Sequence, residues 1–266
     1  MSKKIKKNES NDLNISEEEY MKKKEVLTSF FSDSTYVLMT FKQIANILGV
    51  KKNERIILEK ILTDLEKDGV IYIDESKRYV PCSLKNILKC VYEAKSNKFG
   101  FARSLDGKDV YISNDLSMGA MDQDVILVKI ISEKKDGKNA EGQVIKILDR
   151  KTKNVIGRFN KSRNFGFVEP IDKRISDIYI PKKYSSNFKD DQMVNVEILK
   201  YATSNSKAEG KIIEIIGDLK EENIEIKAMY SAYKVEENQI FNDLVVNEVK
   251  SINTEIEKEK SEAKRS

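Results

Sequence analysis

The sequence predicts a multi-domain α+β protein, in which a small helical domain is followed by two consecutive β-barrels and a charged C-terminal segment. Apolar residues at helical spacing dominate the first part of the chain. A strand-rich cassette then occurs twice, and Phe99 and Tyr111 of the first copy match Phe165 and Tyr179 of the second. The repeat is about 67 residues long, which is the size of a whole small domain rather than of a solenoid unit. From Asp218 onwards the composition turns acidic.

The chain begins with a basic arm and a capped helix. Residues 1–15 are polar and charged and show no periodicity, so we expect them to be disordered. Ser16, followed three residues later by Glu19, is typical of a capping box at the start of a helix. We expect this helix to end near Phe31.

Two further helices and a β-hairpin complete the N-terminal domain, which we place at residues 16–82. Apolar residues at helical spacing predict one helix over 40–49, which ends in a glycine, and another over 53–67. The apolar runs 70–73 and 78–80 flank a polar turn and are typical of a hairpin.

Three helices followed by a β-hairpin is the order of a winged-helix domain. In this interpretation Lys51, Lys52 and Arg55 begin the recognition helix, which could contact duplex nucleic acid. Winged helices also serve as protein-contact domains or scaffolds, and these three charges are equally typical of a solvated helix start. Both alternatives remain open at the level of the sequence.

The two copies of the cassette define two strand-rich domains, at residues 84–149 and 152–217. An Asp-Gly dipeptide at 106–107 separates two strand-like runs and predicts a tight turn. Each copy closes with a similar strand, at 141–147 and at 209–215. Five short strands in about 65 residues favour a small barrel of the OB type.

Aromatic residues on these strands are the candidate binding residues. Side chains at positions i and i+2 of a strand share a face, so Phe99 and Phe101 lie together and Tyr111 can lie beside them. Such a surface stacks on nucleic-acid bases, at about 1–3 kcal/mol per base and with little sequence preference. Alternatively, one aromatic residue of each pair faces inward as core. The second copy repeats the arrangement with Phe165, Phe167 and Tyr179.

Basic residues flank both aromatic groups and are candidates for phosphate contacts. The first group is flanked by Lys95, Lys98, Arg103 and Lys108. The second is flanked by Arg158, Lys161, Arg163 and Lys173.

Charge and composition limit the classes of function. Residues 1–217 hold 40 basic and 32 acidic side chains, whereas residues 218–266 hold 8 basic and 12 acidic ones. A basic body suits a phosphate-backbone partner, although a generally lysine-rich composition accounts for part of the excess. Histidine is absent, which excludes histidine-based catalysis and histidine-ligated metals, and Cys82 and Cys90 form no C-x-x-C motif, so no zinc or redox motif is visible. There is no secretion signal and no apolar run long enough to span a membrane, so we expect a cytoplasmic protein with no membrane partner.

At its paired aromatic motifs the chain resembles cold-shock domains. The pattern is Phe-Gly-Phe followed by a Val-Tyr-Ile or Ile-Tyr-Ile strand, although Lys98 and Asn164 stand where such motifs usually carry glycine. A winged helix before two tandem cold-shock domains resembles the N-terminal region of the ribonuclease R family, 3′→5′ exoribonucleases of the RNase II (RNB) type. Residues 157–181 and 209–217 are the most similar stretches.

The resemblance implies single-stranded or structured RNA as partner, but no catalytic residue can be carried over to this chain. The family's nuclease domain holds two Mg²⁺ ions with a cluster of aspartates, and no such cluster is present. The adjacent pair Asp190 and Asp191 lies in a predicted solvated turn. We therefore expect no metal site and no cofactor here, with Mg²⁺ needed only by the missing nuclease domain. Residues 218–266 resemble a connector toward that domain, in which 224–230 could be strand or helix and 236–264 is weakly helical or disordered.

Three hypotheses of function follow. The leading one is a single-stranded RNA binding and loading module of a ribonuclease R-like exoribonuclease, truncated before its catalytic domain and inactive alone. The second is a stand-alone RNA chaperone or regulator of the cold-shock type. The third is a transcription factor that uses the winged helix on duplex DNA, and the two barrels argue against it.

Overall fold

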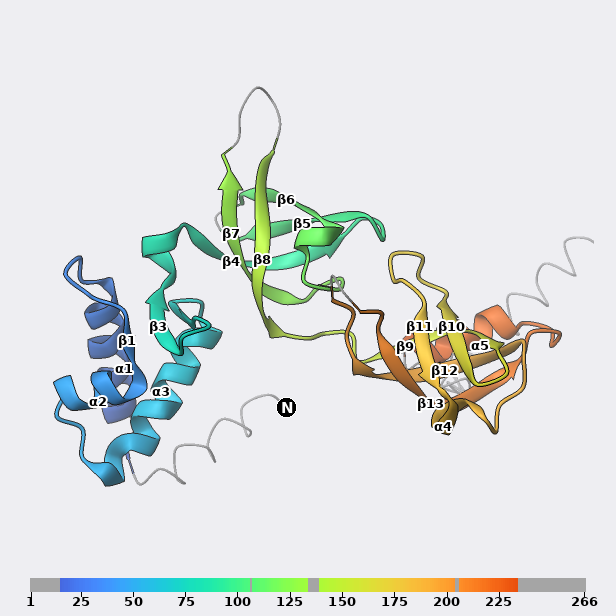
Figure 1. Ribbon diagram of the computed structural model, residues 1–266, viewed down its shortest axis with the longest axis horizontal. Coiled ribbons are helices and arrows are strands. Elements are labelled where there is room, and N and C mark those ends of the chain that lie inside the picture. The colour runs from blue at the N-terminus through green and yellow to red at the C-terminus, as the bar shows by residue number, and fades with distance from the viewer. Residues whose placement is uncertain (1–14, 106, 134–138, 204–205, 234–266) are drawn as a thin grey trace, which may run out of the picture.

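The computed structural model describes residues 15–105, 107–133, 139–203 and 206–233. Three sheets follow one another along the chain, one in the helical domain and two as closed barrels (Figure 1). The predicted α+β fold is confirmed. The predicted arm, apart from residue 15, and the segment 236–264 lie outside the described residues.

The N-terminal domain has the element order of a winged helix. Ser16 caps the first helix by accepting a 3.2 Å hydrogen bond from the Glu19 amide. One element was not predicted, the two-residue strand β1, which pairs with β3 to make a three-stranded sheet in the order β1-β3-β2. The elements are α1 (Glu17–Ser32), β1 (Met39–Thr40), α2 (Phe41–Ile47), the 3₁₀ turn η2 (Lys52–Glu54), α3 (Arg55–Lys67), β2 (Ile71–Ile73) and β3 (Arg78–Pro81).

The core of this domain forms where α3 packs against α1 and the sheet. Ile61, Leu62 and Leu65 of α3 are buried, as the helical spacing predicts, and Leu58 is buried with them. Ile56 belongs to the same predicted apolar set but is 61% exposed. At about 100° of rotation per residue, a position five residues before Ile61 points away from the buried stripe.

Both barrels have the same strand connectivity, which confirms the predicted tandem of OB-type barrels. In each, the first strand pairs with the second and the fourth, and the third pairs in parallel with the fifth. The first barrel consists of β4 (Ile87–Ala94), β5 (Phe99–Ser104), β6 (Asp109–Ser113), β7 (Val125–Ser132) and β8 (Ala140–Asp149). The second consists of β9 (Asn154–Lys161), β10 (Phe165–Pro170), β11 (Ile178–Pro181), β12 (Gln192–Lys200) and β13 (Glu209–Asp218).

Short helical turns join elements at equivalent places. The 3₁₀ turn η3 (Cys82–Lys85) leads into β4, so the first barrel strand begins at Ile87 rather than at residue 84, where we place the start of the domain. In each barrel a short helical segment follows the third strand, η4 (Asn114–Leu116) in the first and α4 (Lys182–Ser185) in the second. The repeat seen in the sequence therefore extends to the connections as well as the strands.

The segment after the second barrel is a helix, which decides between the two structures that the sequence left open. Helix α5 (Ile224–Tyr233) follows β13. Its buried residues Ile224 and Ala228, one helical turn apart, pack on Ile156 and Met193 of the second barrel. This contact provides the apolar burial that a short helix needs.

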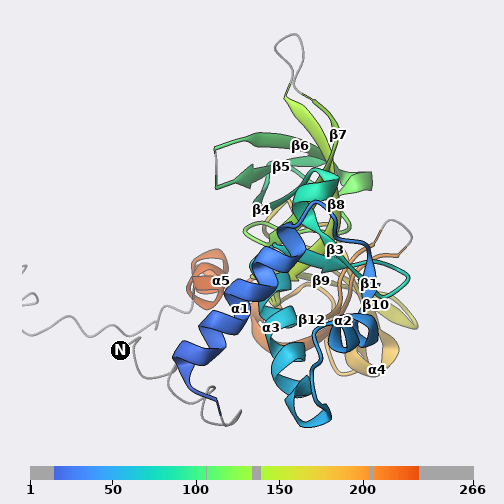
Figure 2. The same cartoon turned by 90° about the vertical axis from the view of Figure 1, so that its left-hand side faces the viewer.

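The helical domain packs against the outside of the first barrel. Figure 2 views the molecule with that domain nearest the viewer. Leu127 of β7 lies between the core residues Ile126 and Val128 and so faces outward, yet it is completely buried. It packs in one cluster with Cys82, Ile87 and Tyr72, the last of these from the β2–β3 hairpin. The hairpin therefore serves as a contact between domains.

The two barrels meet through a buried ion pair. Asp124 is fully buried and accepts a 2.9 Å hydrogen bond from Nη1 of Arg150, which lies in the link between the barrels. The Arg150 guanidinium in turn lies 3.9 Å from the centre of the Tyr201 ring of the second barrel. Burial raises the pKa of Asp124, while backbone hydrogen bonds from Met121 and Lys151 and the charge of Arg150 act against that rise.

Among the described residues, every helix is too short or too polar to cross a membrane.

Removing Asp124 should destabilise the chain strongly. Asp124→Ala leaves the charge of Arg150 without its buried partner, and breaking such a pair costs about 3–5 kcal/mol of the free energy of unfolding. Urea unfolding followed by circular dichroism measures this loss. The matched control is Asp149→Ala, because Asp149 forms an exposed pair with Lys151 at 3.4 Å and such pairs contribute about 0–1 kcal/mol. Equal losses in the two variants would contradict a structural role for Asp124.

Candidate nucleic-acid interface

Three aromatic rings form one outer surface on the first barrel, which we name the first platform. Phe99 and Phe101 lie on β5, and Tyr111 on β6 pairs directly with Phe101. The Phe99 and Tyr111 rings are stacked with centroids 5.7 Å apart, and Phe101 lies edge-on to both at 6.0 Å. All three side chains are half-buried, so each keeps part of its ring accessible.

The second barrel carries the same arrangement, the second platform. Phe165 and Phe167 lie on β10, and Tyr179 on β11 pairs with Phe167. The three ring centroids are 5.3–5.9 Å apart and the rings are again half-buried. The two sets that the sequence singled out are thus brought together in space, three rings to a barrel.

The glycine between the two phenylalanines fixes which way the rings face. Gly100 points into the first barrel, where an added Cβ would lie 2.5 Å from Cζ of Tyr92. Gly166 points into the second, where the Cβ would lie 2.2 Å from Cε2 of Phe159. The alternative that one phenylalanine of each pair is core is therefore wrong. An aromatic residue of the preceding strand fills that place in the core.

The predicted basic residues fall into free and paired groups. Lys98 and Arg163 are exposed and form no ion pair with any residue in the described part of the chain. Arg103 is paired with Glu93 and lies 3.7 Å from Asp109. Three more of the predicted cations are paired with carboxylates. Arg158 donates to Asp191 at 2.8 Å, Lys173 donates to Glu169 at 2.6 Å, and Lys95 pairs with Glu93. Lys161 donates instead to the backbone carbonyls of Ser186 and Phe188.

Two residues near the platforms were not found from the sequence. The ammonium of Lys207 lies 5.0 Å from the centre of the Phe167 ring, within cation–π distance. Lys207 comes from the loop before β13, and no local motif marks it. The second is Glu93. Tyr92 and Phe159 occupy equivalent places below the two glycines, so extending the repeat one strand upstream would have aligned Glu93 with Asn160.

A cleft of about 950 Å³ lies between the two barrels. Ser96 and Asn97 line it near the first platform, and Lys207 lines it near the second. Its lining carries both signs of charge. The basic residues are Lys151, Lys173, Arg174 and Lys207, and the acidic ones are Asp115, Asp122, Glu169, Asp172 and Asp177.

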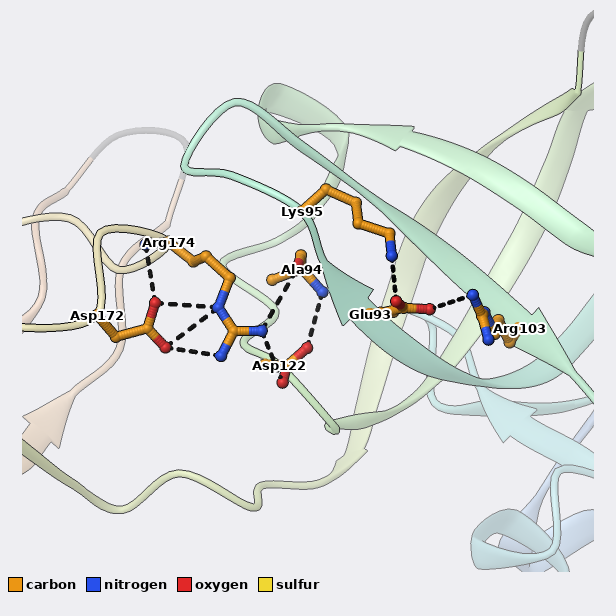
Figure 3. A network of polar contacts seen from close by, with 7 residues as sticks. All are labelled: Glu93, Ala94, Lys95, Arg103, Asp122, Asp172 and Arg174. Carbon is orange, nitrogen blue, oxygen red and sulfur yellow. Dashed lines mark hydrogen bonds and ion pairs between the residues drawn. The ribbon is translucent and has the colours of Figure 1, made fainter. Parts of the chain in front are cut away.

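Arg174 bridges the barrels at this cleft (Figure 3). Its guanidinium is held by Asp172 of its own loop, at 2.7 Å, and reaches Asp122 of the first barrel at 2.9 Å. Asp122 also accepts a 2.9 Å hydrogen bond from the amide of Ala94. The hydrogen bonds and the charges of both carboxylates raise the pKa of Arg174 above its ordinary value, so the guanidinium stays charged.

The pair Asp190 and Asp191 has structural partners. Asp190 accepts a 2.7 Å hydrogen bond from the amide of Lys161, and Asp191 holds Arg158 from a left-handed backbone position with φ of 61°. In the described part of the chain, no group of three or more Asp, Glu or Cys side chains lies close enough to hold a metal ion. Carboxylates placed for two-metal hydrolysis are therefore not among these residues.

Comparison with protein families defines the class of each barrel. The family described as "Ribonuclease B OB domain" matches residues 90–147, in the first barrel. The family described as "Cold shock domain" matches residues 167–238, which begin in the second barrel. Each of the two OB-type barrels is thus similar to a known domain family, the first to the ribonuclease B OB domain and the second to the cold shock domain.

Curated relatives identify the particular protein that the chain resembles. Ribonuclease R of Aquifex aeolicus is 29% identical over 226 residues, which cover 85% of this chain and 31% of the relative. Ribonuclease R of Thermotoga maritima is 27% identical over 240 residues, covering 90% and 33%. The predicted resemblance to ribonuclease R is confirmed. The chain spans about a third of the length of these relatives.

A solved structure shares the fold. RNase R of Mycoplasma genitalium, determined in complex with ribose-methylated single-stranded RNA, matches 62% of this chain and 26% of its own. The TM-score is 0.51 and the sequence identity is 20%.

Gly166→Ala should destabilise the second barrel, because the new methyl group overlaps the Phe159 ring. Overpacking of this kind costs about 1–3 kcal/mol in the free energy of unfolding. Phe159→Leu in the same background should restore part of the loss by removing ring atoms from the overlap. Thermal and urea unfolding of both single variants and the double variant measures the coupling. Additive losses would show that the ring does not exclude a side chain at Gly166.

Proposed function

We propose that this chain is the single-stranded RNA binding and loading module of a ribonuclease R-like 3′→5′ exoribonuclease. The observation that carries the proposal is the pair of outward-facing aromatic platforms on consecutive barrels. The half-exposed rings give bases a surface for stacking, and every base has a π-face that can stack on it. Lys98 and Arg163 beside them, free of ion pairs with the described residues, are available to phosphates.

The comparisons support RNA as the partner. Relatives named ribonuclease R align with most of the chain, and the M. genitalium RNase R was solved with single-stranded RNA bound. Duplex binding through the helical domain has less support, because Tyr72 of its hairpin packs against the first barrel. We place the activity in the cytoplasm, where the buried free thiols Cys82 and Cys90 stay reduced.

The chain alone should bind RNA without hydrolysing it. Among the described residues no three or more acidic or cysteine side chains cluster as a metal site for in-line displacement would require. The platforms would deliver the strand to a nuclease domain, for which Mg²⁺ is the expected cofactor. Labelled single-stranded RNA incubated with pure protein and Mg²⁺ should therefore keep its length, and shortened products would contradict this part of the proposal.

Loss of the platforms should abolish most of the RNA affinity. The triple change Phe165/Phe167/Tyr179→Ala, and separately Phe99/Phe101/Tyr111→Ala, removes stacking worth about 1–3 kcal/mol per base. We expect at least one triple variant to bind about tenfold or more weakly than the unchanged chain. Fluorescence anisotropy with a labelled oligouridine at two salt concentrations measures the Kd and its salt dependence.

The control for these variants is Tyr230→Ala, which removes a ring that is 40% exposed on α5 and belongs to neither platform. It should leave the Kd unchanged. Circular dichroism establishes that each triple variant is folded. Unchanged affinity in both folded triple variants would contradict the proposed function.

A further inference from the structure

The two platforms differ at one equivalent position. In the first barrel Glu93 on β4 pairs with Phe101, which pairs with Tyr111. Residues that lie opposite each other on neighbouring strands share a face, so Glu93 belongs to the same outer row as the two rings. In the second barrel the corresponding row is Asn160, Phe167 and Tyr179. A carboxylate thus stands beside the first platform where a neutral amide stands beside the second.

Glu93 pairs with two of the cations beside the first platform, Lys95 and Arg103. Its Oε2 accepts from Nη2 of Arg103 at 2.6 Å, and its Oε1 pairs with the ammonium of Lys95 (Figure 3). These contacts hold the pKa of Glu93 below its ordinary value, and Arg174 at the junction of the barrels contributes to the same effect. The side chain of Glu93 is 25% exposed, whereas those of Lys95 and Arg103 are 41% and 57% exposed, so both cations can be reached from solvent.

The second platform has no carboxylate in the row that corresponds to Glu93, and a cation lies over one of its rings. Asn160 is neutral, and the ammonium of Lys207 lies over the Phe167 ring. Lys207 forms no ion pair with a residue in the described ranges. The nearby acid Glu169 is paired with Lys173 at 2.6 Å, and Arg158 is paired with Asp191. A strand that stacks on the second platform therefore meets a cation that no described carboxylate holds.

We propose that Glu93 acts as an internal substitute for an RNA phosphate on the first platform, so that a single strand binds first and more tightly on the second platform. This inference rests on the proposed function. Carboxylates and phosphates accept the same charge-assisted hydrogen bonds from lysine and arginine. A phosphate that binds Lys95 and Arg103 competes with Glu93 for their donors, and its charge is repelled by that carboxylate. Position 93 thus sets the order and the relative affinity of the two platforms.

Neutralising Glu93 should strengthen the first platform. The test uses Glu93→Gln in the Phe165/Phe167/Tyr179→Ala background, so that binding reports the first platform alone. The expected result is an affinity for labelled oligouridine about threefold to tenfold higher than in the parent triple variant. The slope of log K against log salt should steepen by about 0.7 for each additional phosphate contact. Anisotropy titrations at salt concentrations from about 50 to about 200 mM measure both the affinity and the slope.

The reverse change should weaken the second platform. Asn160→Glu, in the Phe99/Phe101/Tyr111→Ala background, places a carboxylate beside Phe167 and should lower the affinity severalfold. Glu18→Gln is the control for net charge, because Glu18 pairs with Lys22 on α1 at 2.9 Å, in the helical domain. It should leave the affinity of either background unchanged.

The outcomes separate this inference from the proposed function. If the unchanged chain binds RNA through a platform, but Glu93→Gln has no larger effect than Glu18→Gln, the role of Glu93 is wrong and RNA binding stands. An affinity lowered by Glu93→Gln, in protein with an unchanged circular dichroism spectrum, would likewise overturn it. If neither platform triple variant affects the affinity of folded protein, the proposed function itself fails.

Discussion

The packing of one aromatic ring beneath one glycine is the constraint on which both barrels depend. Tyr92 fills the space under Gly100, and Phe159 fills the space under Gly166, so no side chain fits at either glycine. Because strand residues alternate between faces, the phenylalanines on both sides of the glycine must then point outward. The outer aromatic surface is thus a direct consequence of how the core is filled. In the Phe-Gly-Phe motif, the glycine leaves room for the core ring and the two phenylalanines form the outer surface.

Charged and polar groups connect the barrels to each other, and Met121 of the first barrel also packs against the core of the second. Arg174 reaches from the second barrel to Asp122, and the buried pair of Asp124 and Arg150 supports the link between them. Gly119, at a φ of 69°, lets its backbone approach the Ala202 carbonyl so closely that a Cβ would lie 1.9 Å from the oxygen. Such contacts need defined geometry to offset the cost of desolvation, so they favour one arrangement of the two barrels.

The two copies of the repeat share their strand order and aromatic motif but differ in the charges around that motif. Both barrels share strand order, the glycine at the centre of the motif and three outward rings. They differ in the charges around those rings, with Glu93 on one and Asn160 with Lys207 on the other. A close-packed core tolerates few changes, whereas an exposed position can change charge at little cost in stability. Two binding surfaces of one shape can therefore acquire different affinities for a charged strand.

The sequence by itself determined the local features of this protein. Alternation and the repeat predicted the barrels and the six aromatic residues, and helical spacing predicted the core of the N-terminal domain. Each of these patterns depends only on residues within one helix or strand, so it can be recognised without the fold. Only the tertiary structure decided that Ile224–Tyr233 is a helix, that Lys95 and Arg103 are held by Glu93, and that Lys207 lies over Phe167. Burial against the second barrel selects the helix. The pairing of charges depends on side chains from different strands and loops, which meet only when each barrel closes.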